Sequence, residues 1–168
     1  MRRLRYSVID TSLMQIRILS GADVRAAIDM PVAIEAMRQA FATLSAGGAT
    51  VPVRLPLESE HGVTLFMPAH LKDTAVAGAK VVSVNPGNAA EGLPVIHAVV
   101  LAIDPVTGQT TAVMDGTWLT ALRTGAVGGL AADLLSRPES STVALFGAGV
   151  QARTQLQAVR CVREISEV

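Results

Sequence analysis

Aromatic residues, cysteines and long apolar runs are all scarce in this 168-residue sequence, and each shortage excludes something. Aromatic residues make up 3% of a chain that is half hydrophobic, so its core must be built from Ala, Val, Leu and Ile, as is typical of α/β proteins. The single cysteine, Cys161, excludes an internal disulfide and a cysteine-rich metal site, and it favours a reducing, cytoplasmic location. No apolar run approaches the ~20 residues of a membrane span.

Neither sign of charge is in excess, because 14 basic residues stand against 14 acidic ones. The chain therefore has no electrostatic footprint for nucleic acid or an anionic membrane. The basic start Met1–Arg5 is like a signal-peptide n-region, but polar residues interrupt the next stretch of chain before an apolar segment develops. We therefore expect residues 1–15 to form a flexible extension. No histidine pair has metal-ligand spacing, so no metal is predicted, and His97 is expected to be a hydrogen-bonded core residue.

Residues 16–115 have the pattern of an α+β domain. Ser20 to Asp23 can cap a short helix, and apolar residues at three- and four-residue steps predict a second helix from about Pro31 to Leu44. Alternating or continuous apolar stretches then predict five strands, at residues 51–57, 63–68, 76–84, 95–103 and 110–114. Turn residues between the last two strands make them a hairpin. Successive strands of this kind predict a mostly antiparallel sheet.

A long helix is predicted from Thr117 to Ser136, within a connecting segment of residues 116–140. Its interior glycines, Gly125, Gly128 and Gly129, should together cost roughly 2 kcal/mol relative to alanine. Two interpretations can offset this cost. Either the helix packs closely on a neighbouring backbone, or a cofactor or substrate lies against it, with Arg123 and Thr124 as polar contacts.

Residues 141–168 have the pattern of a strand, a tight turn and a helix. An apolar run at 143–146 leads into Gly147-Ala148-Gly149-Val150-Gln151-Ala152, which matches Gly-x-Gly-x-x-Ala. Gly147 permits a sharp bend, Gly149 leaves room for a pyrophosphate, and Ala152 lets the helix pack on the strand. The free N–H groups and positive end of that helix would face the anion. This pattern predicts the first βα unit of an α/β Rossmann domain that binds a dinucleotide. Its second strand would lie beyond the end of the sequence.

Taken together, these stretches resemble the ornithine cyclodeaminase/mu-crystallin family. The resemblance rests on Arg123-Thr124-Gly125-Ala126 and Gly147–Ala152, and it extends in order to Met67-Pro68-Ala69, Gly78–Val82 and Ala112–Gly116. It covers nearly the whole chain from about residue 18 onward. It implies a homodimeric, NAD(P)-dependent enzyme with two domains. The first would bind the substrate and pack its sheet against that of the partner subunit, and the second would be the Rossmann domain.

The resemblance also implies roles for individual residues. Arg54 and Arg123 match the positions that hold the substrate carboxylate, which guanidinium groups can clamp through two hydrogen bonds. Lys80 matches the lysine near the reacting carbon, and a lysine inside an apolar strand should have a partner or a lowered pKa suited to proton transfer. The alternatives are a solvated charge at Arg54 and an exposed edge-strand lysine at Lys80. The cofactor-binding residues implied in the same way are Thr124, Gly147, Gly149, Val150 and Gln151.

The activity that the resemblance favours is reduction of a cyclic ketimine such as pyrroline-2-carboxylate. Val95 stands where ornithine-processing members have a threonine that contacts the cofactor, and the loop Asn85–Asn88 is more like that of reductase-type members. Three alternatives remain. The protein is an ornithine cyclodeaminase, it is an alanine dehydrogenase-like enzyme, or it is a non-catalytic NAD(P)- or small-ligand-binding protein or inactive fragment. The family's catalytic aspartate and its ribose-reading residues would lie beyond Val168. We therefore expect the 168-residue chain alone to be inactive.

Overall fold

The computed structural model describes residues 7–11, 14–72, 74 and 76–168. The chain divides into two compact units. The first unit, Met1–Arg25 with Thr43–Trp118, contains the whole sheet, and the second, Ala26–Ala42 with Leu119–Val168, is helical. Within the described part of the chain, no helix is long and apolar enough to cross a membrane.

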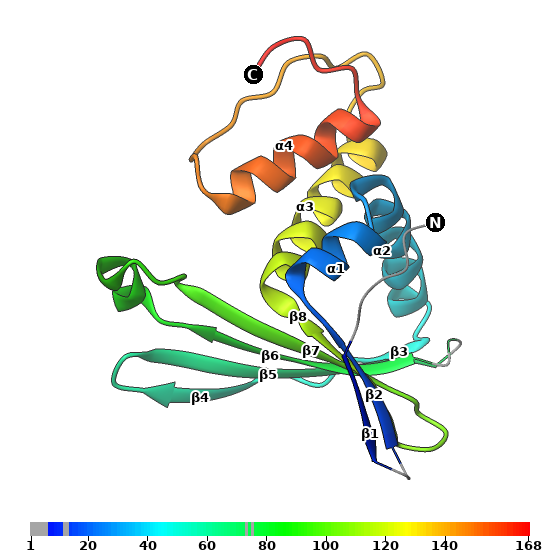
Figure 1. Cartoon of the computed structure of the whole chain (residues 1–168). Coiled ribbons are helices and arrows are strands. Elements are labelled where there is room, and N and C mark those ends of the chain that lie inside the picture. Colours follow the sequence, from blue (N-terminus) through cyan, green and yellow to red (C-terminus); the bar gives the residue numbers. More distant parts are fainter. Residues whose placement is uncertain (1–6, 12–13, 73, 75) are drawn as a thin grey trace. The chain divides into compact units, whose positions relative to one another are not determined.

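Eight strands form one mixed sheet in the first unit (Figure 1). Their order in space is β1-β2-β8-β7-β6-β5-β3, and β4 also pairs with β5. Every pair is antiparallel except β2 with β8. The predicted antiparallel pairing is therefore confirmed, with one parallel pair that the sequence did not reveal. The strands are β1 Ser7–Thr11, β2 Met14–Leu19, β3 Ala49–Thr50, β4 Leu55–Ser59, β5 Gly62–Leu71, β6 Val76–Val84, β7 Ile96–Ile103 and β8 Thr110–Asp115.

One face of the sheet is covered where helix α3, Gly116–Leu135, begins. Val82 on β6 aligns with Ala98 on β7, and both side chains are buried. A Cβ added at Gly116 would lie 2.9 Å from the Cβ of Ala98. A side chain at position 116 would therefore push the helix away from the sheet, and glycine allows the close approach.

The opposite face carries a row of aligned apolar residues, Leu55, Phe66, Val81 and Val99, which we call the outer row. Val99 is 44% exposed and Leu55 is 67% exposed. In the next row on this face, the hydroxyls of a Thr64–Ser83 pair are hydrogen-bonded at 2.8 Å. Contiguous exposed apolar surface of this kind marks an interaction face more often than a solvated one.

Short polar side chains define where the helices begin. Before α1, Gly21–Ala27, the Ser20 hydroxyl accepts from the Asp23 amide, and the Asp23 carboxylate accepts from the Ser20 amide at 2.9 Å. This reciprocal capping is the one that the sequence predicts. Asp29 caps α2, Met30–Ser45, by accepting from a first-turn amide at 3.0 Å. Asp115 caps α3 in the same way. A 3₁₀ helix, η1 Pro86–Glu91, precedes β7.

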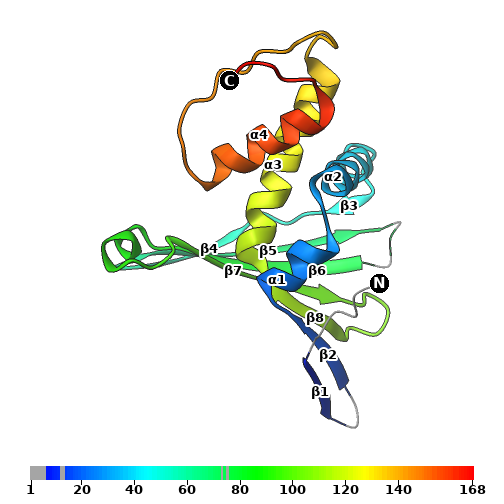
Figure 2. The same ribbon diagram turned by 45° about the horizontal axis from the view of Figure 1, so that its top comes forward.

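In the second unit, α3 packs against α4, Val150–Val162 (Figure 2). A Cβ at Gly125 would lie 2.5 Å from the main-chain oxygen of Thr154, and one at Gly129 would lie 2.8 Å from the Cβ of Ala158. Thr154 and Ala158 are buried. Close helix packing therefore accounts for these two glycines, and it is a neighbouring protein helix that lies against them.

Residues 1–15 are not a flexible extension throughout, which corrects the prediction. Residues 7–11 form β1, and β2 begins at Met14. Five residue pairs align between the two strands, and β2 also pairs with β8 through residues 17–19. Pairing with a neighbour supplies hydrogen bonds that a short polar segment cannot make alone. Residues 1–6, 12 and 13 lie outside the described part of the chain.

Two other predicted strands differ from the structure. The strand expected at 51–57 is present only from Leu55, where β4 begins, and residues 51–54 between β3 and β4 are not in a strand. Pro52 in the gap has no N–H to donate, and Pro56 is tolerated because β4 is an edge strand. The strand expected at 143–146 is absent, and only an isolated parallel bridge joins Thr142 to Glu167. No other strand of the described chain pairs with this segment.

Candidate functional site

The glycine turn before α4 has the backbone that the motif requires. Gly147 has φ +100°, a left-handed conformation that side-chain-bearing residues rarely adopt. Gly149 is the N-cap of α4, with φ −79° and ψ −173°, and no side chain caps the helix. A Cβ at either glycine would meet nothing within 4 Å, and Val150 is 66% exposed. The first amides of α4 therefore have no side-chain partner and face open space, so they can donate to an anion.

Arg123 and Thr124 lie on α3, in the same unit as the turn. The Arg123 side chain is exposed, and Thr124 is half-buried. The Thr124 hydroxyl donates to the Thr120 carbonyl at 2.7 Å and keeps its lone pairs as acceptors. The main-chain carbonyl of Thr124 accepts from Gln155 of α4 at 3.3 Å, so Thr124 belongs to the part of α3 that packs on α4.

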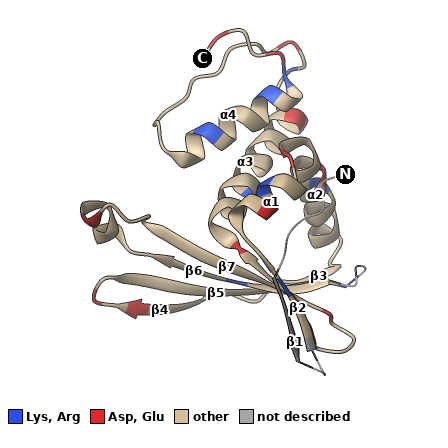
Figure 3. Cartoon of the chain, viewed as in Figure 1, with Lys and Arg blue, Asp and Glu red and all other residues tan. Residues whose placement is uncertain are grey.

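Lys80 lies in the middle of β6, and its side chain is half-buried. It aligns with Met67 on β5 and Val100 on β7. Because side chains alternate along a strand, Lys80 shares the face of Val82, which is the face covered by the start of α3. Charged residues are sparse along β5, β6 and β7 (Figure 3). An exposed edge-strand lysine is therefore excluded, because β6 is central in the sheet.

Two other predicted polar residues are exposed. Arg54 directly precedes β4, and its side chain is exposed. His97 is exposed on β7, which corrects the expectation of a core histidine. The prediction failed because β7 has one covered and one uncovered face, and His97 falls on the face of the outer row.

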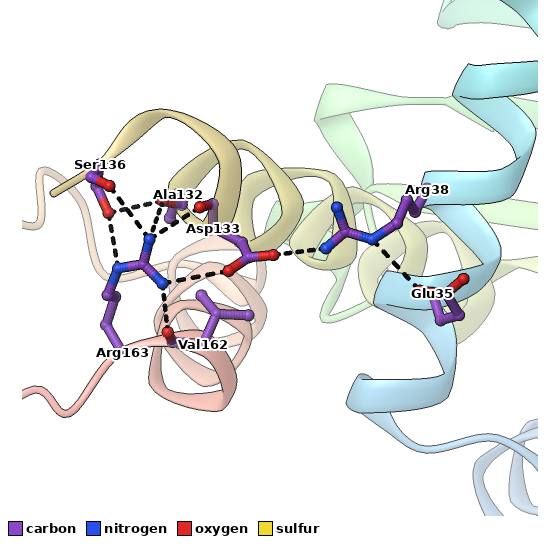
Figure 4. Close-up of polar contacts among 7 residues, drawn as sticks. All are labelled: Glu35, Arg38, Ala132, Asp133, Ser136, Val162 and Arg163. Carbon is purple, nitrogen blue, oxygen red and sulfur yellow. Dashed lines mark hydrogen bonds and ion pairs between the residues drawn. The ribbon is translucent and has the colours of Figure 1, made fainter. Parts of the chain in front are cut away.

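A charge network at the ends of α3 and α4 was not predicted from the sequence (Figure 4). The Arg163 side chain is 10% exposed and donates to the Asp133 carboxylate at 3.2 Å. It also donates to the main-chain carbonyls of Ala132, Asp133 and Ser136. Arg38 of α2 bonds the other oxygen of Asp133 at 2.5 Å. Hydrogen bonds from Arg38 and from Arg163 lower the pKa of Asp133.

This network ties three helices together within the second unit. Arg163 donates to carbonyls at the C-terminal end of α3, where the last carbonyls of a helix lack amide partners further along it. The one local signal in the sequence is a basic residue just after α4, and its partners lie about 30 positions earlier. The spacing of residues within one helix therefore could not predict this network.

Comparisons with known proteins match most of the chain. The chain matches the model of the ornithine cyclodeaminase/mu-crystallin family over residues 14–168. It is 43% identical to the alanine dehydrogenase of Archaeoglobus fulgidus over 155 residues, which cover 92% of this chain and 48% of the relative. It is 34% identical to a Delta(1)-pyrroline-2-carboxylate reductase of Bacillus cereus over 153 residues, which cover 90% of this chain and 47% of the relative.

A solved structure is similar to the same extent. The Thermococcus litoralis Delta(1)-pyrroline-2-carboxylate reductase in complex with NADH and L-proline superposes with a TM-score of 0.85 at 45% identity, covering 88% of this chain and 46% of that one. This chain thus spans about half the length of the relatives that it matches. By sequence and by fold, the chain belongs to the ornithine cyclodeaminase/mu-crystallin family.

Proposed function

We propose that this chain acts in an NAD(P)-dependent enzyme that reduces a cyclic ketimine of the pyrroline-2-carboxylate type to the amino acid. The observation that carries the proposal is the open glycine turn at the start of α4, in a chain 45% identical to a reductase solved with NADH and L-proline. Residues 16–115 would bind the substrate and form the dimer, and residues 141–168 would open the dinucleotide-binding domain. A cytoplasmic location is part of the same proposal.

The turn fits a dinucleotide on its own geometry. The φ of +100° at Gly147 turns the chain sharply, and the empty space at Gly149 leaves room for a pyrophosphate beside the backbone. Val150 and Gln151 would present the first amides of α4 to its oxygens. Thr124 would add a hydroxyl from α3. When bound, the reduced nicotinamide would give a hydride to the imine carbon as the imine nitrogen gains a proton.

Arg54, Arg123 and Lys80 would act on the substrate. The two guanidinium groups would hold its carboxylate, because each can donate two parallel hydrogen bonds to it. Lys80 would supply the proton for the imine nitrogen, directly or through water. Its half-buried place between the apolar residues Met67 and Val100 supports this role.

Two other reactions have specific support. Alanine dehydrogenation is favoured by the 43% identity to the Archaeoglobus fulgidus enzyme. Cyclodeamination is favoured by a TM-score of 0.77 and 38% identity to a lysine cyclodeaminase. Val95 supports the reductase over the cyclodeaminase, because valine lacks the hydroxyl with which ornithine-processing members contact the cofactor. The alternative to an enzyme is a non-catalytic protein that binds NAD(P).

We also propose that two copies of the chain associate through the sheet face that carries the outer row. The row is apolar, and three of its four residues, Leu55, Phe66 and Val99, are exposed. A similar structure, at 43% identity, is an archaeal alanine dehydrogenase dimer with bound NAD. Burying apolar surface against a second copy contributes roughly 25 cal/mol for each Å² removed from water.

The decisive experiment uses a form of the protein as long as the relatives that it matches. It is incubated with NADH or NADPH and either pyrroline-2-carboxylate or pyruvate with ammonium, and separately with NAD or NADP and ornithine. We expect oxidation of the reduced nicotinamide with the cyclic imine, and proline as the product. Faster oxidation with pyruvate and ammonium would replace the proposal by the dehydrogenase. Proline and ammonia formed from ornithine would replace it by the cyclodeaminase. Cofactor binding with no turnover of any substrate would leave the binding protein.

A further inference from the structure

Gln155 joins the two helices that carry the proposed ligand-binding residues. It lies in the second turn of α4, half-buried, and its Nε2 donates to the main-chain carbonyl of Thr124 in α3 at 3.3 Å. Within α3, that carbonyl also accepts the amide of Gly128, four residues on. A carbonyl oxygen has two lone pairs, so Gln155 occupies the one that the helix leaves free.

Gly128 makes this hydrogen bond possible. A Cβ at position 128 would lie 1.7 Å from Oε1 of Gln155 and 2.8 Å from its Cδ. Any larger residue would therefore displace the Gln155 amide from its observed position on α3. An interior glycine costs a helix about 1 kcal/mol relative to alanine. Close packing on α4 explains why positions 125 and 129 are glycine but does not explain position 128. The Gln155 side chain, which lies against position 128, does.

Gln155 has proposed ligand-binding residues on both sides. Gln151, in the dinucleotide turn, is four residues earlier on α4, so it lies on the same face of the helix as Gln155. On α3, the accepting carbonyl belongs to Thr124 and is adjacent in the chain to Arg123. Among the described residues of α3 and α4, the Gln155–Thr124 hydrogen bond is therefore the polar contact nearest to both the dinucleotide turn and Arg123.

We propose that Gln155 is a positioning residue that couples dinucleotide binding at the Gly147–Gln151 turn to carboxylate binding at Arg123. The inference rests on the proposed function. A dinucleotide that fixes the first turn of α4 also fixes Gln155, and through it the Arg123–Thr124 segment of α3. Arg123 is then held in place before the carboxylate arrives, so each ligand raises the affinity for the other by the same factor.

The test is a fluorescence titration of the protein with NADH, with and without saturating L-proline. In the wild type, we expect L-proline to tighten NADH binding about five-fold or more. Gln155→Met keeps the length of the side chain and removes its donor, and we expect it to bring that factor close to one. Gly128→Ala, which displaces the unaltered glutamine amide, should do the same. A loss of helix stability alone would weaken NADH in both titrations and leave their ratio unchanged.

Gln157→Met is the matched control, because Gln157 is an exposed glutamine of the same helix. It should keep the wild-type ratio. If Gln155→Met also keeps the ratio, or if the wild type binds NADH with no response to L-proline, the inference is overturned and the proposed function stands. If the wild type binds neither NADH nor NADPH, the proposed function fails and the inference fails with it. Circular dichroism of each variant identifies any that does not fold.

Discussion

Replacing Arg163 by methionine tests whether the end of α3 depends on one guanidinium group. Arg163 is 10% exposed and donates to three carbonyls in the last turns of α3 and to the Asp133 carboxylate. Methionine keeps the apolar stem and removes every donor. The carbonyls of Asp133 and Ser136 then lose this donor, while that of Ala132 keeps the Ser136 amide and hydroxyl. The carboxylate keeps one arginine, Arg38.

The expected loss is set by these contacts. A hydrogen bond from a charged donor contributes about 1.5–3 kcal/mol, and several here share one group and would in part be replaced by water. We therefore expect Arg163→Met to lower the free energy of unfolding by about 3 kcal/mol. In a protein of this size, this corresponds to a fall of about 6–12 °C in the unfolding midpoint.

Urea and thermal unfolding, followed by circular dichroism, measure this loss, and hydrogen exchange locates it. Amides in the last turn of α3 should exchange faster in Arg163→Met. Arg160→Met is the matched control, since Arg160 is an exposed arginine in the last turn of α4, three residues before Arg163, and it should change stability by less than ~0.5 kcal/mol. If the two variants agree within ~0.5 kcal/mol, Arg163 does not anchor α3, and our reasoning about the network is wrong.

Four further results are expected. Because hydrogen bonds from Arg38 and Arg163 lower the pKa of Asp133 from its usual 3.8, its stabilising contribution is complete above that pH and is lost as pH falls through the lowered value. Unfolding midpoints measured against pH should show this acid-dependent loss in the wild type and lack it in Asp133→Asn. Denaturant titration should show Gly125→Ala destabilised by about 1–3 kcal/mol and Gly87→Ala, whose Cβ would meet open space, nearly unchanged. Val99→Lys places a charge in the outer row and should give a monomer in sedimentation experiments. Steady-state kinetics of Lys80→Met should show kcat reduced about 100-fold or more, with NADH affinity unchanged.

The sequence predicts best those elements whose signal is local. The apolar run that predicts a strand at 76–84 gives β6 with the same bounds, and β7 and β8 differ from their predictions by one residue at one end. The capping residues around Ser20 place the start of α1, and the helix predicted from about Pro31 begins as α2 at Met30. In each case, the side chains that determine the element are its own or its immediate neighbours, so no tertiary contact is needed to find it.

The features that the sequence does not predict depend on distant partners. Residues 7–11 form a short, partly polar segment, and they become β1 because β2 supplies five aligned partners. The role of Arg163 depends on the end of α3, and that of Gln155 on a carbonyl 31 residues away. The register also decides that His97 falls on the uncovered face of the sheet, which its strand pattern alone does not reveal.

The two halves of the glycine motif depend on their surroundings to different degrees. Helix α4 makes its backbone hydrogen bonds internally, and its buried face, with Thr154 and Ala158, packs on α3, so it forms at the predicted place. To form a strand, residues 143–146 need the backbone hydrogen bonds of a neighbouring strand, and no strand of the described chain is paired with them. Their apolar side chains are correspondingly uncovered, with Phe146 95% exposed. A strand flanked by parallel neighbours would bury both faces of this segment. The turn at Gly147 and the helix after it are therefore properties of the local sequence, whereas the strand before them is a property of the sheet that receives it.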